Sequence, residues 1–317
     1  MAEQGTAGTV VRHRRSPVGA AKRSTWASGR SRVARPRAGG AHRSPRSFSR
    51  SRQAWSLYLL KIPALCQLAR RSTVASAAAT GIVQVVLSYF LWRAVYANTD
   101  TAAGLDVNQA ISYVTMAILI RRIRWGSHVY SRESMSALVR DGRIGYWFLR
   151  PVSARRYHLL KSVGEVLYWG SWSMVGFALG LATGVIMTPP SPAAGVVSAV
   201  SLVLGQALTY QLLLIIDLLC FWTTANRNAT LVYSFSHDLL SGAFVPLWYF
   251  PGWFQSVVHW LPFEGTLNIP VSLYVGRVPV VDAPKQLAIQ LAWCCVLGVV
   301  THTLWQRAGR RVAVQGG

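Results

Sequence analysis

The sequence is poor in acidic side chains and in catalytic motifs. It has 10 Asp and Glu against 33 Lys and Arg, a formal net charge of +23. It contains no GxxxxGK[ST], HExxH or GxSxG motif and no paired carboxylates in a polar loop. We therefore expect that the chain is not an enzyme and does not bind ATP through a phosphate loop. Energy for any work it does would come from an ion gradient or another subunit.

Cysteine is also scarce. The four cysteines are Cys66, Cys220, Cys294 and Cys295. All lie in apolar surroundings, and none has His or Cys neighbours at the spacing of a metal site. This pattern supports neither a disulfide framework nor a zinc site, so we expect no bound metal.

The positive charge is concentrated in residues 1–54. Glu3 is the only acid there, Arg recurs throughout, and Ser, Gly, Ala and Pro are frequent. The segment has no apolar periodicity, so we expect a disordered basic tail. It fits a lipid-binding segment, a transit-type segment or a dispensable extension. A membrane-anchored nucleic-acid-binding protein would instead use the tail to bind DNA in a salt-dependent way, but we favour no nucleic-acid partner.

The rest of the chain, residues 55–317, contains long apolar runs. A helix needs about 20 mostly apolar residues to cross a bilayer. The expected spans are Val74 to Trp92, Val107 to Ile120, Val166 to Thr188, Ala193 to Ile216, Asn228 to Phe250, and Gln286 to Gln306. We therefore predict an all-α integral membrane protein with six transmembrane helices, of which the second is the least secure.

The distribution of Lys and Arg predicts the orientation. Residues 1–73, 121–161 and 307–317 are rich in Arg, whereas the alternate loops have little base. All three basic segments fall on one side, which the positive-inside rule assigns to the cytoplasm together with both termini. Before the first span, apolar residues from Trp55 to Leu68 recur at helical spacing. We favour an interfacial amphipathic helix there over an extension of the span, because Pro63 would kink an extension.

Ionisable residues inside spans are costly and therefore functional candidates. For Glu165 and Asp217, near span ends, pairing with Arg of the long loop is the favoured role over transport. His237 and Asp238 fall about mid-span, either as a satisfied interhelical hydrogen bond or as a polar patch on a substrate path. The candidates for such a path are His237, Asp238, Ser241, Gly242 and Pro246, of which Gly242 and Pro246 would loosen or bend the helix. Trp248, Tyr249 and Trp253 would form an aromatic belt at the outer interface.

Two further segments stand out. Apolar residues 257–277, after the fifth span, are broken by Pro and Gly, so we expect short helices that lie in or re-enter the outer leaflet. The residues singled out there are Pro251, Leu261, Pro262, Phe263, Pro270 and Gly276. The basic loop carries RIGYWFLRPVSARRYHLLK, residues 143–161. Gly142 would cap a helix before it, and Pro151 would stop a short apolar helix within it.

Taken in order, these features resemble the membrane subunit of type-two ATP-binding cassette (ABC) exporters. The motifs that carry the resemblance are DGRIGYWFLRPVSARRY, LSGAFVPLWYFP and HWLPFEGTLNIPVSLYVG, and the first is similar to the family form RxGxIxxxLLRPV. The resemblance covers residues 55–317 and leaves out the basic tail. His237 and Asp238 are not part of the family pattern.

The resemblance implies a bacterial plasma-membrane permease and a division of labour. A separate nucleotide-binding subunit would bind ATP and Mg, and two permease chains, identical or related, would form the translocation path among membrane lipids. A cytoplasmic coupling helix would touch the ATPase through Arg140, Gly142, Arg143, Ile144, Leu149, Arg150 and Pro151. A solvated positive loop is the plainer interpretation of those residues. A secondary transporter driven by protons through Asp217 or His237 and Asp238 is the alternative function.

Overall fold

The computed structural model describes residues 60–61, 64–65, 71–98, 101–102, 104–128, 153–222 and 226–315. Within them, six helices have at least 15 residues. They are α2 (Arg71–Val95), α3 (Val107–His128), α6 (Ala154–Ala182), α7 (Pro192–Leu218), α8 (Asn226–Leu240) and α11 (Ala283–Gln315). Each overlaps one predicted span, and the mainly helical fold is confirmed.

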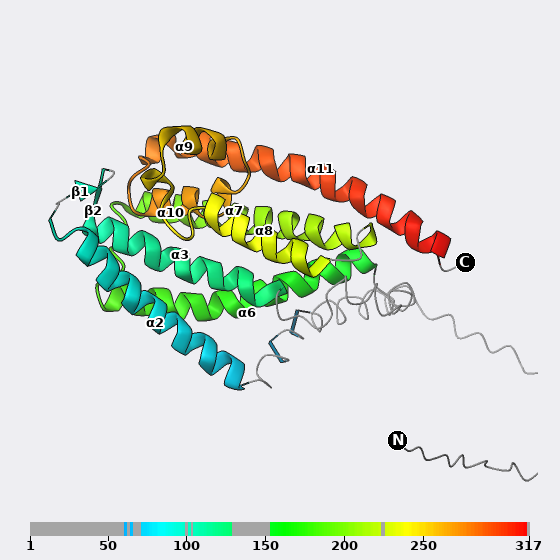
Figure 1. Ribbon diagram of the computed structural model, residues 1–317, viewed down its shortest axis with the longest axis horizontal. Helices are drawn as coiled ribbons and strands as arrows, with labels where there is room; N and C mark the ends of the chain where they lie inside the picture. The colour runs from blue at the N-terminus through cyan, green and yellow to red at the C-terminus, as the bar shows by residue number, and fades with distance from the viewer. Residues whose placement is uncertain are drawn as a thin grey trace, which may run out of the picture. The chain divides into compact units, whose positions relative to one another are not determined.

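Short elements connect the long helices. They are β1 (Thr101–Ala102), β2 (Leu105–Asp106), η1 (Leu219–Phe221), η2 (Leu247–Tyr249), α9 (Gly252–His259), η3 (Glu264–Thr266), α10 (Asn268–Tyr274) and η4 (Val280–Asp282). The connections 96–106, 183–191 and 241–282 all meet at one end, at the left of Figure 1, which we call the connecting end. β1 and β2 form a small antiparallel pair there, in which Thr101 lies opposite Asp106.

Three described segments are long and apolar enough to cross a membrane: Val74–Val95, Pro192–Leu218 and Val280–Ala308. The count of six spans and their orientation stay predictions. Several helix bounds differ from the predicted ones. α6 begins at Ala154, well before Val166, because Arg and Lys at its start are good helix formers although they are not apolar.

α7 lies at the centre of the packing and contacts α11, α10 and η3. Ser191 caps its start, since the Ser191 hydroxyl accepts a hydrogen bond from the Ala194 N–H at 3.1 Å, and Pro192 follows at the first helical position. Within α7, Gly205 lies directly under η3. A Cβ there would be 2.9 Å from the carbonyl oxygens of Gly265 and Thr266, so only glycine permits this approach.

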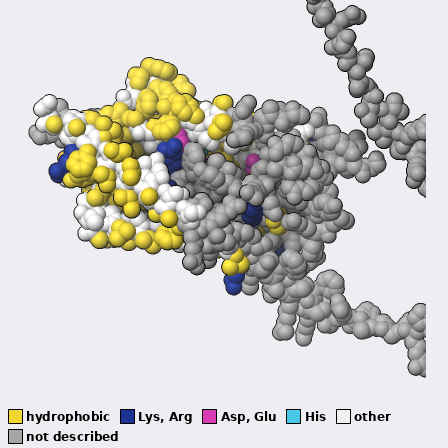
Figure 2. All heavy atoms as spheres, turned by 60° about the horizontal axis from the view of Figure 1, so that its bottom comes forward, with side chains coloured by type: hydrophobic (Ala, Val, Ile, Leu, Met, Phe, Trp, Pro, Cys, Tyr) yellow, Lys and Arg dark blue, Asp and Glu magenta, His cyan; other side chains and the backbone are white. Residues whose placement is uncertain are grey.

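A second core surrounds α3, which packs on α2 and α6. Its buried residues include Tyr113, Met116 and Ile120. In contrast, α2 exposes much of its apolar surface, including Ile82, Leu87 and Phe90. Figure 2 shows hydrophobic side chains spread over the described part of one face, with few charged ones. Such a surface is typical of a protein that faces lipid or a partner.

Candidate functional site

Asp238, predicted to lie inside a span, holds α8 against α3. The residue is 1% exposed, and its carboxylate forms an ion pair with Arg121, at 2.9 Å from Nε to Oδ2. The Arg124 guanidinium donates hydrogen bonds to Asp238 and to Nδ1 of His237. Arg124 of α3 thus forms an interhelical hydrogen bond with His237, while the other ring nitrogen has no partner among the described residues, so both predicted roles stay open.

The arginines of this cluster were assigned to the cytoplasmic loop, because the second span was expected to stop before Arg121. α3 instead continues to His128. Arg121 and Arg124 are three residues apart and so share a helix face, which buries Arg124 at 8% exposure. The sequence did contain a signal for these ion pairs. Asp238 is an acid inside one apolar run, and Arg121 and Arg124 lie at helical spacing directly after another apolar run, residues 107–120.

The hydrogen bond from Arg124 determines the tautomer of His237. A guanidinium only donates hydrogen bonds, so Nδ1 accepts and the ring hydrogen of the neutral imidazole lies on Nε2. Among the described residues, Nε2 of His237 has no hydrogen-bond partner, and neither have the buried hydroxyls of Tyr233 and Ser241. Tyr233 and His237 lie in α8 and Ser241 directly follows it, at intervals of four residues. Because the Ser241 N–H still bonds to the His237 carbonyl at 2.9 Å, the three side chains share one face. The predicted path residues His237 and Ser241 thus belong to a buried polar stripe.

Gly242 and Pro246 do not bend a long span as expected. α8 ends at Leu240, and its 15 residues extend about 22 Å. Gly242 has φ +79°, and the N–H groups of Ala243 and Gly242 bond back to the carbonyls of Asp238 and Leu239. This pattern is a glycine C-cap, which a bend prediction overlooked. Pro246 is buried and precedes η2.

The segment after η2 forms the short helices α9 and α10, and its place in a membrane leaflet stays a prediction. Pro251 is exposed and starts α9. Leu261 is half-buried and Pro262 buried in the turn that follows. Phe263 points its ring edge-on at His237, with ring centroids 5.6 Å apart. The predicted loop and path residues are therefore neighbours here.

All seven residues of α10 are buried. The carbonyl of Pro270 accepts a hydrogen bond from the Ser198 hydroxyl of α7 at 2.7 Å. The Tyr274 hydroxyl donates to the Met187 carbonyl at 3.0 Å, and burial raises the pKa of this phenol, which keeps it a donor. Gly276, with φ +79°, turns the chain out of the helix. These hydrogen bonds between uncharged groups hold α10 inside the connecting end.

Two cavities open beside α10. The first, which we call the amide cavity, has a volume of about 390 Å³. Its lining includes Gln109, Trp248, Glu264, Asn268, Ser272, Arg277 and Gln286. The second, which we call the tryptophan cavity, has a volume of about 410 Å³. It is lined by Leu247, Trp248, Gln255, Ser256, His259, Trp260, Glu264 and Asn268.

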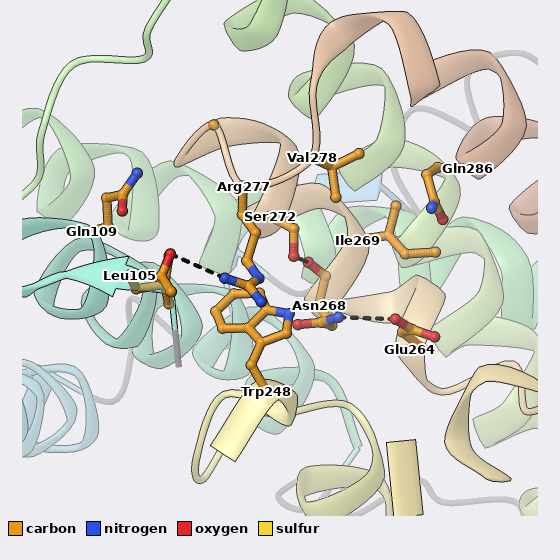
Figure 3. Close-up of a pocket in the computed structure, with 12 residues that line it drawn as sticks. Leu105, Gln109, Trp248, Glu264, Asn268, Ile269, Ser272, Arg277, Val278 and Gln286 are labelled. Carbon is orange, nitrogen blue, oxygen red and sulfur yellow. Dashed lines mark hydrogen bonds between the residues drawn. The ribbon is translucent and has the colours of Figure 1, made fainter. Parts of the chain in front are cut away.

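Trp248, Glu264 and Asn268 line both cavities. Figure 3 shows the Arg277 guanidinium over the indole of Trp248, 4.8 Å from the ring centroid, and Glu264 beside Asn268. Tyr113 supports this wall, since its hydroxyl donates to Oδ1 of Asn268 at 3.0 Å. Trp248 was expected in an aromatic belt at the membrane interface, but it packs inward on Tyr113 with ring centroids 4.8 Å apart.

The other predicted sites have different outcomes. Asp217, expected to pair with the long loop, lies 3.6 Å from Nε2 of His158 in α6. The predicted coupling residues are Arg140, Gly142, Arg143, Ile144, Leu149, Arg150 and Pro151, and they lie outside the described residues. The tail 1–54 and most of the predicted interfacial helix lie outside them as well.

A family model matches most of the chain. The family model described as ABC-2 family transporter protein matches residues 82–316, which is more than half of the chain and contains every helix described here except the start of α2. Comparisons with curated proteins and with solved structures give no significant match.

Proposed function

The chain belongs to the ABC-2 family of transporter proteins, and from this we propose that it is the membrane permease subunit of an ABC-type exporter. The match over residues 82–316 is the observation that carries the proposal. As a permease, the chain forms the translocation path, and a separate nucleotide-binding subunit binds ATP and Mg and hydrolyses the ATP.

The charge distribution along the helices supports the proposed orientation. Basic residues gather where α6 begins and α11 ends, as with Arg155, Arg156, Arg307 and Arg310. The connecting end is poorer in base. Under the positive-inside rule, the basic end is cytoplasmic and the connecting end faces outward. This supports six spans in a bacterial plasma membrane with both termini inside.

Coupling to the ATPase is assigned to residues 140–151. Arg140, Arg143 and Arg150 offer charge to acids on a partner, while Ile144 and Leu149 offer an apolar contact. Two permease chains, as a homodimer or a heterodimer, surround the path, and closure of the ATPase pair moves them between inward- and outward-facing states. The exposed apolar surface of α2 is available to lipid or to the second permease.

The polar stripe indicates which chemical groups the translocation path would accept. Tyr233, His237 and Ser241 keep buried polar atoms without partners among the described residues, and such atoms are costly in an apolar interior. Water or a polar part of a substrate would satisfy them when the stripe opens.

Co-purification with the ATPase tests the proposal. The ATPase with a Walker motif is expected to be encoded by a neighbouring gene. Replacing Arg143 with Glu or Leu149 with Ala is expected to lower ATPase recovery about ten-fold or more, which corresponds to the loss of one good interface contact. Lys285→Ala, at the connecting end, is the matched control and leaves recovery unchanged. Normal recovery with both loop variants would refute the docking role.

The alternative is a secondary transporter driven by protons through Asp217 or through His237 and Asp238. Vesicles that contain the chain without an ATPase subunit would then accumulate substrate under a proton gradient alone. We expect no such transport, and transport that needs the ATPase and ATP. The ion pairs of Asp238 with Arg121 and Arg124 support this expectation, because they commit this buried carboxylate to holding α8 against α3.

A further inference from the structure

Glu264 lies in the wall shared by the amide and tryptophan cavities, and its carboxylate is incompletely compensated. Its side chain is 20% exposed. Oε1 accepts a hydrogen bond from the neutral amide of Asn268 at 3.0 Å. Oε2 lies 3.2 Å from Nδ1 of His259, which is itself half exposed. Among the described residues no Lys or Arg comes within ion-pair distance of Glu264. The carboxylate is therefore held in place by one neutral amide and one half-exposed histidine.

The lining of the tryptophan cavity contains this carboxylate and no Lys or Arg. The indole rings of Trp248 and Trp260 both line it. Trp260 is 80% exposed, so its ring is open to a ligand. Trp248 already holds the Arg277 guanidinium over its ring on the side of the amide cavity. An aromatic face attracts cations through its quadrupole, and a nearby carboxylate adds an attraction of the same sign.

We propose that the tryptophan cavity binds an organic cation, with its ammonium group between Glu264 and the Trp260 indole and its apolar part against Leu247. A single carboxylate beside aromatic rings suits an alkylated ammonium better than a divalent metal ion, which requires several oxygen ligands. The cavity volume of about 410 Å³ is in the range of small-molecule sites.

The position of the cavity assigns the site a role in substrate release, and this role rests on the proposed permease function. The cavity lies at the connecting end, beside α10 and η3, where the proposed orientation places the outer side of the membrane. Phe263, directly before η3, touches His237 of the polar stripe, so the two regions are contiguous. A cationic substrate that leaves the path would meet Glu264 before release.

Choline and its neutral isostere 3,3-dimethylbutan-1-ol test charge recognition directly. Both are titrated into the purified full chain in detergent at pH 8, where an ordinary histidine is neutral, and binding is followed by saturation-transfer NMR. We expect choline to bind about ten-fold more tightly than the alcohol, as one ion contact of about 1.4 kcal/mol would give. Equal binding of the two probes would overturn the proposal.

Three variants locate the site. Glu264→Gln keeps an acceptor for Asn268 but removes the charge, so choline affinity is expected to fall about ten-fold and to equal that of the alcohol. Trp260→Leu is expected to weaken choline by about three-fold or more. Asp282→Asn, an exposed acid of η4 outside both cavities, is the matched control and leaves affinity unchanged. Unchanged binding in Glu264→Gln, or the same loss in Asp282→Asn, would overturn the assignment.

These measurements use the permease alone and are independent of the ATPase. If choline binding depends on Glu264 but the chain does not co-purify with an ATPase, the proposed permease function is refuted and the proposed binding site stands. If the chain couples normally to the ATPase but does not select choline over the alcohol, the binding site is refuted and the permease function stands. The two proposals therefore fail separately.

Discussion

Asp238 and Glu264 are two carboxylates in the same bundle with opposite surroundings. Asp238 is 1% exposed and contacts the guanidiniums of Arg121 and Arg124. Glu264 faces two cavities and accepts from an amide and a histidine. A buried charge must be paired to be tolerated, so the first carboxylate is committed to holding α8 on α3. The second keeps its charge available to a ligand.

The largest effect is expected from Asp238→Ala. Removal of this carboxylate takes away the acidic partner that α8 offers to the buried Arg124 guanidinium, and breaking a buried ion pair typically costs about 3–5 kcal/mol. The free energy of unfolding, measured by denaturant titration in mixed micelles, is expected to fall by that amount. Asp282→Ala removes an exposed acid and is expected to stay within about 0.5 kcal/mol of the parent. A loss below about 1 kcal/mol for Asp238→Ala would mean that the cluster does not hold the helices together.

The cavity region is held in a different way, by close backbone contact, and Gly205→Ala tests this. The added Cβ would be 2.9 Å from the carbonyl oxygens of Gly265 and Thr266, so η3 must shift. We expect a loss of about 1–3 kcal/mol, as for overpacking of a well-packed core. Choline affinity should fall as well, because η3 carries Glu264.

Gly170→Ala is the control for this variant. It lies in α6, where a Cβ would have no neighbour within 4 Å. Alanine favours a helix over glycine, so this change is expected to be neutral or stabilising by up to about 1 kcal/mol. If both glycine variants behave alike, the contact of α7 with η3 does not position the cavity wall.

The sequence predicted the helices better than their ends, and the reason lies in what each pattern measures. Apolar runs identify where a helix is buried or lies in lipid, which located α2, α7 and α11 well. They say nothing of how far a helix continues into polar sequence, so the start of α6 and the end of α3 were missed. Gly242 was taken for a bend, because sequence alone does not distinguish a glycine kink from a glycine cap.

The two sites differ in the same respect. His237 and Asp238 were found from sequence because an ionisable pair inside an apolar run is conspicuous. The cavity wall was not, since Gln109 lies in α3 whereas Trp248, Glu264 and Arg277 are spread along the connection 241–282, and only the fold brings them together. Each of these residues is unremarkable in the sequence, and periodicity carries no information about contacts between a helix and a distant loop.

Glu264→Gln is expected to have the smallest effect on stability. The glutamine carbonyl can still accept the hydrogen bond from Asn268, and no buried cation loses a partner. The free energy of unfolding should therefore remain within about 0.5 kcal/mol of the parent, while choline selectivity disappears. The same denaturant titration measures it beside Asp238→Ala. A cost for Glu264→Gln that approaches that of Asp238→Ala would make both carboxylates structural, because a residue kept for a ligand contributes little to the fold without it.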